Sequence, residues 1–246
     1  TYFWKIVAHD DHGNTTVGDV WEFSTITEFL LWSCGDTIVD PRDGQVYTTV
    51  QIGNQCWMSE NLNIGLRLDI GTPQTNNSIY EKFCYNNIED SCNIYGGLYQ
   101  WDEVMQYTTV QGTQGICPTG WHIPTDNEWK ILEGSVDSQY GIGDPEWNGY
   151  GYRGYDASHH MRSTSGWLSN GNSTNNSGFS GLPGGETTIS SSSAWGMRGS
   201  WWASLEYLGG YSGTFAHYRY IQYSSGQVNR TAHDKTDGRS VRCIKN

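Results

Sequence analysis

A cysteine and a histidine five residues apart are the first residues in this sequence that could do chemistry together. They are Cys117 and His122, in the stretch GICPTGWHIPTDNEWKIL, residues 115–132. A thiol beside an imidazole is the arrangement of a nucleophile and its general base. Thr125 and Glu128 in the same stretch predict a capping box at a helix start. Two interpretations are open: a catalytic segment, or a structural brace between a turn and a helix.

Three aspartates at short spacing form a second candidate site. Asp36, Asp40 and Asp43 lie in and just before the turn sequence DPRDG, residues 40–44, and oxygen ligands at short spacing suit Ca²⁺. The spacing does not match the EF-hand pattern, and Asp-Pro-x-Asp-Gly is also a good turn sequence. Calcium is the cofactor that these residues suggest, and a simple turn is the alternative.

An aromatic loop is the third candidate. The stretch EWNGYGYRGYD, residues 146–156, separates its rings by glycines and places one arginine among them. Rings presented in this way can stack on sugar faces or on a protein partner. The alternative is that the rings fold inward and pack the loop. The candidate ligand-binding residues are Trp147, Tyr150, Tyr152, Arg153 and Tyr155.

The cysteines indicate disulfide bonds. Their even number, their wide spread and the absence of a CxxC pair favour disulfides and an oxidising compartment over a zinc or redox motif. Six cysteines allow 15 pairings, and the sequence does not choose among them. Our working arrangement is Cys34–Cys56, Cys84–Cys92 and Cys117–Cys243.

Composition and charge exclude several classes of partner. The chain has 246 residues, of which only 16% are charged and 14% are aromatic, and its net charge is −12. Such an acidic chain is a poor partner for nucleic acid or for an anionic membrane surface. We found no apolar run long enough to span a membrane, so no membrane insertion is expected. With few aliphatic residues, Trp and Tyr must supply much of the core.

The elements that would position these candidates are mostly short strands. Alternating residues predict one hairpin from residues 2–8 and 17–25, and another from residues 46–52 and 55–58 joined by Gly53–Asn54. Apolar residues on one face predict helices over residues 98–106 and 126–138. The runs WWASLEY, HYRYIQY and RSVRCIK, residues 201–207, 217–223 and 239–245, are the expected late strands.

The first hairpin resembles the last two strands of a fibronectin type III or immunoglobulin-like domain, over residues 1–26. An isolated hairpin is marginally stable in water, so this one needs a partner surface. That surface could come from preceding strands, from the second domain of the same chain, or from a neighbouring chain.

The rest of the chain resembles the Fibrobacter succinogenes major paralogous domain. The segments that carry the resemblance occur in the family's order between residues 34 and 246: DPRDGQVYTTVQIGNQCWMSENLN, GICPTGWHIPTDNEWKIL, SGFSGLPGG, WWASLEY, AHYRYIQY and GRSVRCIKN. This family is similar to the C-type lectin-like fold of formylglycine-generating enzymes and of diversity-generating retroelement proteins. The resemblance implies an α+β fold with two helices, a small twisted antiparallel sheet, long loops and a disulfide that ties the C-terminal strand to the body.

The same resemblance argues against enzymatic activity. Formylglycine-generating enzymes hold copper with a cysteine pair near the C-terminal end of the fold, whereas the last hundred residues here contain only Cys243. GFSGL is not a GxSxG nucleophile elbow, and the lectin-type calcium triplet is not found. On this fold Cys117 would pair with Cys243, which favours the structural brace over the catalytic segment.

We therefore expect three parts: the end of a fibronectin-type or immunoglobulin-like domain at 1–26, a linker at 27–33, and a C-type lectin-like domain at 34–246. The expected function is a non-enzymatic, secreted or cell-surface module for adhesion or display that binds a glycan or a protein through its loops. One alternative is a structural subunit that self-associates by β-strand addition through the N-terminal hairpin. Another is an oxidase or hydrolase related to the enzymes of the fold.

Overall fold

The computed structural model describes residues 2–23, 32–211 and 213–246. The chain divides into two compact units, Thr1–Ser33 and Cys34–Asn246, which are described separately. Most of the expected linker, residues 27–33, lies outside the described residues, which include only Trp32 and Ser33 of it.

The first unit is a hairpin in two short pieces. The outer pair joins β1 (Tyr2–Trp4) to β4 (Trp21–Phe23), and the inner pair joins β2 (Val7–His9) to β3 (Thr15–Val17). Trp4 lies opposite Trp21, with the ring centroids 5.9 Å apart. Both rings are exposed. The likeness to fibronectin type III domains stays a prediction.

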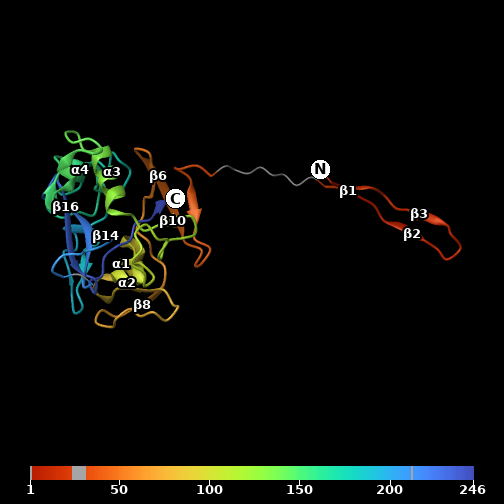
Figure 1. The fold of residues 1–246 in the computed structure, drawn as a ribbon, viewed down its shortest axis with the longest axis horizontal. Coiled ribbons are helices and arrows are strands. Elements are labelled where there is room, and N and C mark those ends of the chain that lie inside the picture. Colours follow the sequence, from red (N-terminus) through yellow and green to blue (C-terminus); the bar gives the residue numbers. More distant parts are fainter. Residues whose placement is uncertain (1, 24–31, 212) are drawn as a thin grey trace. The chain divides into compact units, whose positions relative to one another are not determined.

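The second unit contains two main antiparallel sheets (Figure 1). The five-stranded sheet has the order β10-β17-β7-β6-β5, and the four-stranded sheet has the order β11-β16-β15-β14. The first sheet is built from β10 (Trp121–His122), β17 (Ile244–Lys245), β7 (Gln55–Met58), β6 (Val46–Ile52) and β5 (Thr37–Val39). The second is built from β11 (Gly151–Arg153), β16 (Val228–Asp234), β15 (Phe215–Gln222) and β14 (Arg198–Glu206).

Two minor sheets and six short helical segments complete the unit. The minor strand pairs are β8 (Leu66–Leu68) with β9 (Glu81–Phe83), and β12 (Glu186–Thr187) with β13 (Ser192–Ser193). The α-helices of the described residues are α1 (Glu89–Tyr95), α2 (Trp101–Val104), α3 (Asp126–Val136) and α4 (Ala157–Met161), and the 3-10 turns are η1 (Tyr85–Asn87) and η2 (Pro145–Asn148). No described helix is long and apolar enough to cross a membrane.

The expected fold class, a C-type lectin-like α+β domain with two helices and one small sheet, is wrong. The described chain is mostly β and contains several sheets. Many strands have only two or three residues, which is too short for a recognisable alternation of apolar and polar side chains. The helix expected over 98–106 is a single turn, α2, because Gln106 and Tyr107 adopt positive φ angles of 49° and 59°. Its apolar residues are buried by tertiary packing.

Two local predictions are confirmed. Thr125 Oγ1 accepts a hydrogen bond from Glu128 N at 3.2 Å, and Glu128 Oε2 accepts one from Thr125 N at 2.8 Å, which forms the capping box of α3. β6 and β7 form the expected hairpin. In its turn, Gly53 has a φ of 59°, and a Cβ there would lie 2.5 Å from Ser135 Oγ of α3, so glycine permits this close approach.

Tryptophan supplies much of the core, as the composition predicts. Six of the 12 tryptophans are fully buried. Trp57, Trp129, Phe179 and Trp201 form one group in which neighbouring ring centroids lie 5.0 to 6.3 Å apart. Edge-to-face contacts of this kind stabilise a core beyond the area that they bury.

The working arrangement of disulfides is confirmed. Cys34 bonds to Cys56, Cys84 to Cys92, and Cys117 to Cys243. The last bond joins residues 126 positions apart and ties the segment before β10 to the segment before β17.

The loop that each disulfide closes predicts its contribution to stability. On the chain-entropy relation, Cys117→Ala/Cys243→Ala should lower the free energy of unfolding by about 5 kcal/mol, against about 2.5 kcal/mol for Cys84→Ala/Cys92→Ala. All four cysteines are fully buried, and the second pair spans only 8 positions, so the two variants are matched in burial and differ in loop length. Urea unfolding monitored by tryptophan fluorescence would measure both. Equal losses would contradict the entropic account.

Candidate ligand-binding site

A hollow of about 230 Å³ lies at one end of the four-stranded sheet, and we call it the aromatic hollow. It is lined by aromatic side chains from β15 and from two segments outside the sheet, and by β16. The lining residues are Tyr150, Tyr207, Tyr211, Phe215, Thr231 and Ala232. None of them carries a charge, and Tyr150 and Tyr211 are largely exposed. The hollow therefore offers apolar ring faces together with phenolic hydroxyl groups.

Stacked rings form one wall of the hollow. Tyr211 stacks on Phe215 with the centroids 4.5 Å apart, and Phe215 stacks on His233 at 5.6 Å. His233 Nδ1 in turn lies 2.5 Å from Asp237 Oδ2. Since Phe215 and His233 are on neighbouring strands, the sheet holds this column of rings in place.

A glycine turns Tyr150 into the hollow. Tyr152 lies in register with Asn229, on the face of the sheet opposite Arg230. Gly151, between the two tyrosines, has a φ of 80°, which L-residues with side chains rarely adopt. The alternation of β11 is broken there, and the Tyr150 ring packs 5.6 Å from the His217 ring instead.

The buried His217 packs against two tyrosines of the hollow. Its ring lies 5.6 Å from that of Tyr150 and 5.7 Å from that of Tyr207, and its Nε2 is 3.2 Å from the Tyr150 hydroxyl. Its Nδ1 has no hydrogen-bond partner among the described residues. Burial, followed by the positive charge of Arg230, lowers the pKa of His217 to about 4. The imidazole is therefore neutral at pH 7.

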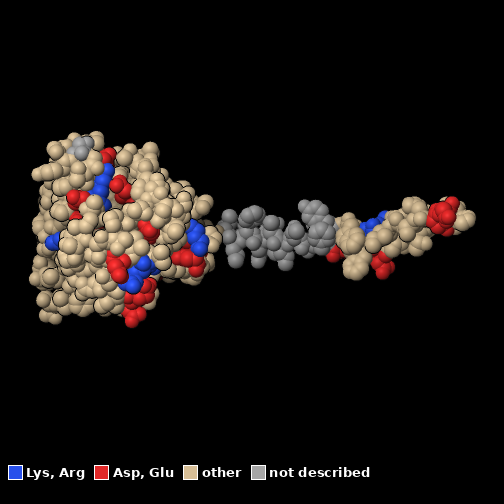
Figure 2. All heavy atoms as spheres, turned by 90° about the horizontal axis from the view of Figure 1, so that it is seen from below, with Lys and Arg blue, Asp and Glu red and all other residues tan. Residues whose placement is uncertain are grey.

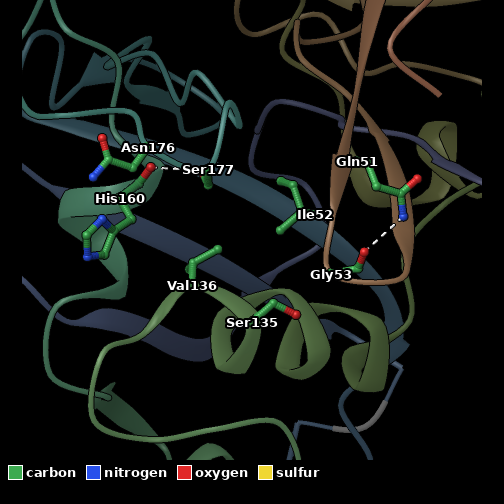
Figure 3. A pocket seen from close by; sticks show the side chains of 8 residues that line it. All are labelled: Gln51, Ile52, Gly53, Ser135, Val136, His160, Asn176 and Ser177. Carbon is green, nitrogen blue, oxygen red and sulfur yellow. Dashed lines mark hydrogen bonds between the residues drawn. The ribbon is translucent and has the colours of Figure 1, made fainter.

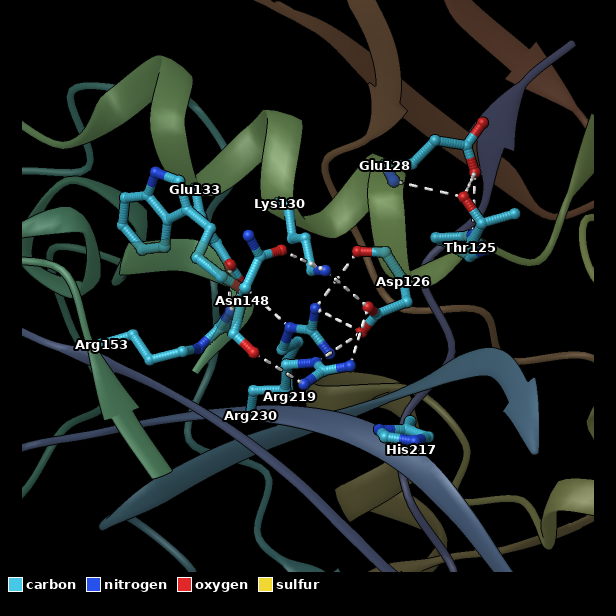
Figure 4. Close-up of polar contacts among 12 residues, drawn as sticks. Thr125, Asp126, Glu128, Lys130, Glu133, Asn148, Arg153, His217, Arg219 and Arg230 are labelled. Carbon is cyan, nitrogen blue, oxygen red and sulfur yellow. Dashed lines mark hydrogen bonds and ion pairs between the residues drawn. The ribbon is translucent and has the colours of Figure 1, made fainter. Parts of the chain in front are cut away.

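A buried ion cluster joins α3 to the sheet beneath the hollow (Figure 4). Glu133 bridges two strands, because its Oε1 accepts from Arg219 Nε and its Oε2 from Arg153 Nη2, both at 2.7 Å. Asp126 Oδ1 accepts from Arg219 Nη2 and from Arg230 Nε, both at 2.8 Å. The helix therefore contacts β11, β15 and β16 through paired charges.

The cluster also supports Tyr150. The Arg230 guanidinium lies 4.5 Å from the centre of the Tyr150 ring, a cation–π contact. Burial alone would raise the pKa of Asp126, but Arg219 and Arg230 hold it well below its usual range. The Asp126 carboxylate therefore stabilises the fold above the pKa of an unfolded aspartate, and this stabilisation is lost as the pH falls toward its folded pKa.

The predicted aromatic loop is divided by the structure. Tyr150, Tyr152 and Tyr155 are exposed, whereas Trp147 and Arg153 are each only 1% exposed. Tyr150 lines the hollow, and Tyr152 lies on the other face of the sheet, edge-to-face with Tyr220 at 5.8 Å. A ligand-binding role stays a prediction for the three tyrosines, and we do not extend it to the two buried side chains.

The three aspartates do not form a cluster. The carboxylate of Asp40 is buried and engaged by Arg42, whose Nη2 lies 2.6 Å from Asp40 Oδ2. Asp43 accepts a hydrogen bond from Gln45 N, as in a turn, and Asp36 is exposed. Among the residues that the structure describes, no three His, Cys, Asp or Glu side chains converge as a metal site would need. Calcium binding stays an untested prediction.

Cys117 and His122 act as a brace. Cys117 is oxidised to a disulfide with Cys243, so it cannot serve as a nucleophile. His122 Nε2 lies 2.9 Å from Glu128 Oε1, and its Nδ1 lies 2.8 Å from Asn246 Oδ1. The contact with Glu128 raises the pKa of His122 against the effect of burial. The histidine thus links the capped start of α3 to the chain's last residue.

Sequence reasoning missed most of the hollow. Tyr207, Tyr211 and Phe215 lie in YLGGYSGTF, residues 207–215. This stretch has glycines between its rings, as residues 146–156 do, so the same signal could have identified it. His217 and the ion cluster left no such signal, because their partners come from distant segments.

A second cavity, of about 340 Å³, lies between the β6–β7 turn, the end of α3 and α4 (Figure 3). Its polar groups are mostly engaged by the protein: Gln51 Nε2 donates to Gly53 O, Ser135 Oγ to Ile131 O, and Ser177 Oγ to His160 O. No tyrosine, phenylalanine or tryptophan of the described residues lines it, so it lacks the ring faces of the aromatic hollow.

The fold and the hollow define the larger unit as a disulfide-bonded, β-rich domain with an aromatic surface site. The model of the Fibrobacter succinogenes major domain matches residues 50–245, and the chain belongs to that family, as the six sequence segments predicted. Searches of curated proteins and of solved structures gave no significant match.

The neutral state of His217 predicts a pH dependence of stability. A histidine whose pKa is lowered by folding stabilises the native state above its unfolded pKa of about 6.5, and this contribution is lost as the pH falls toward its folded pKa, about 4. The contribution of His217 to the free energy of unfolding should therefore fall by about 3 kcal/mol between pH 7 and pH 4. Urea unfolding at pH 7 and at pH 4 would measure this fall, and the His217→Gln variant should lose less stability over the same interval. An equal loss of stability in the variant would contradict the assignment to His217.

The ion cluster predicts one large mutational effect. Glu133→Gln leaves Arg153 and Arg219 buried without their shared carboxylate, so the free energy of unfolding should fall by about 3–5 kcal/mol. The matched control is Glu89→Gln, which removes a carboxylate that pairs with Arg67 at the surface and should cost about 1 kcal/mol or less. Thermal or urea unfolding would compare the two, and similar losses would contradict a buried, tightly coupled cluster.

Proposed function

We propose that this chain is a non-enzymatic, secreted or cell-surface binding module and that its aromatic hollow binds a glycan. The observation that carries the proposal is the hollow itself, in which the exposed rings of Tyr150 and Tyr211 lie at the end of the four-stranded sheet. Sugar rings present apolar faces and hydroxyl groups, and tyrosines match both. The three disulfides support a location outside the cytoplasm.

The charge distribution supports a glycan over a nucleic acid. The net charge is −12. On the face of the molecule shown in Figure 2, Lys and Arg lie scattered beside Asp and Glu and form no basic stripe. A phosphate backbone would need such a stripe. A protein ligand remains the alternative occupant of the hollow.

Binding of the intact chain to a glycan array tests the proposal. Tyr211→Ala and Tyr150→Ala should each weaken binding about tenfold, since exposed anchor rings typically contribute more than 1 kcal/mol. Trp195→Ala is the matched control, because this exposed ring lines a different cavity with Tyr85 and Ile94. The affinity of this variant for the glycan should be unchanged. Equal effects of all three variants, or no glycan bound at all, would contradict the proposal.

The same array tests calcium. If Asp36, Asp40 and Asp43 hold Ca²⁺ for a ligand, a chelator should abolish binding. If the hollow binds the glycan by stacking, binding should be indifferent to the chelator, as we expect.

A second function is structural assembly through the N-terminal hairpin. The apolar side chains of Phe3 and Trp21 are 65% and 59% exposed, and a two-stranded hairpin has two free edges. We propose that, if the first function fails, this hairpin pairs with a strand of another subunit. Light scattering of the intact chain tests it: Trp4→Ser/Trp21→Ser should dissolve any assemblies, and a wild-type chain that is monomeric at high concentration would contradict it.

A further inference from the structure

The ion cluster beneath the hollow carries more positive than negative charge. Two carboxylates, Asp126 and Glu133, face four cationic side chains from α3, β11, β15 and β16, which are Lys130, Arg153, Arg219 and Arg230. The cluster therefore has an excess of two positive charges within a chain whose net charge is −12. Lys130 is partly exposed, so one positive charge of the excess is buried. Burying it is unfavourable unless an opposite charge compensates it.

Two donors in the cluster have no partner among the described residues. These are Arg219 Nη1 and Arg153 Nε, and the two side chains are almost completely buried. Buried guanidinium groups normally satisfy their donors. The two carboxylates therefore leave two donors of the cluster without a partner among the described residues.

A cavity of about 370 Å³ opens beside the cluster, and we call it the side cavity. Lys130 and Asn148 both line it, and Lys130 Nζ donates to Asn148 Oδ1 at 3.0 Å. The Asn148 carbonyl also accepts from Arg230 Nη1 at 3.4 Å, so an exposed, neutral residue contacts two cations (Figure 4). Asp144 lines the same cavity, so its lining carries one cation and one carboxylate, Lys130 and Asp144. With Asp144 counted, the cluster behind the cavity still has four positive charges against three negative ones.

Arg230 connects the side cavity to the aromatic hollow. Its guanidinium contacts Asn148, which lines the side cavity, and stacks on Tyr150, which lines the hollow. Because Asn148 and Tyr150 are only two residues apart, one extended ligand can reach both. A sugar ring would stack in the hollow, and its neighbour in the glycan would lie near Lys130.

We propose that the glycan is acidic, and that its anionic group binds at Lys130 and Asn148. This inference rests on the proposed function of the hollow. A carboxylate or a sulfate ester would accept from the Lys130 ammonium and the Asn148 amide and would compensate the positive excess. The carboxylate and the sulfate ester are both anionic oxygen groups on a sugar. The binding experiment described next distinguishes between them.

Matched ligands test the proposal on the intact chain. The probes are uronate-containing oligosaccharides and the same oligosaccharides after reduction of their carboxyl groups to alcohols, together with sulfated oligosaccharides before and after desulfation. At low ionic strength we expect one acidic form to bind about fivefold more tightly than its neutral counterpart, and salt should reduce the preference. The pair that shows the preference identifies the anionic group.

Two variants with the same change in net charge test whether Lys130 causes the preference for the acidic form. Lys130→Gln should remove the preference for the acidic form while retaining affinity for the neutral form. Lys5→Gln changes an exposed lysine of the hairpin and should keep the preference. Thermal melting of both variants checks that each remains folded.

The outcomes separate this inference from the proposed function. Equal affinity for both members of every pair, or a preference that survives in Lys130→Gln, would overturn the acidic subsite while binding of neutral forms still supports the hollow. Binding of no glycan in any form would reject the hollow as a glycan site and the subsite with it.

Discussion

The paired charges between α3 and the four-stranded sheet are the constraint on which the rest of the larger unit depends. Glu133 and Arg219 are completely buried, and neither could remain there without the other, since an unpaired buried charge costs several kcal/mol. Apolar contacts alone would allow the helix to slide, whereas charge-assisted hydrogen bonds require one position. The helix, β11, β15 and β16 are therefore held in a single arrangement.

The aromatic hollow inherits its rigidity from that arrangement. Arg230 belongs to the cluster and also stacks on Tyr150, so one guanidinium serves both the fold and the surface. A pre-organised ring loses little conformational freedom when a ligand binds, which favours affinity from a small contact area. Arg230 thus links the buried charges to the surface site, by hydrogen bonds on one side and by a cation–π contact on the other.

Local features of this chain were predictable, and long-range ones were not. The capping box of Thr125 and Glu128 and the turn at Gly53 depend on residues adjacent in sequence, so their chemistry is visible there. Arg153 was expected at a binding surface, but its carboxylate partner, Glu133, lies 20 residues away on α3, and no local pattern reveals such a pair. The fold class was missed for a related reason, because strands of two or three residues are defined by their neighbours in space.

The position of β17 has a consequence for how the domain forms. This strand, Ile244–Lys245, lies between β10 and β7 in the five-stranded sheet, although it is the last strand in the sequence. The sheet cannot close until β17 has been synthesised. The pairing of β17 with β10 and β7 joins residues far apart in the sequence, which slows folding. The five-stranded sheet therefore forms in two stages: β5, β6 and β7 can pair as soon as they are made, and the place between β7 and β10 is filled only when β17 arrives.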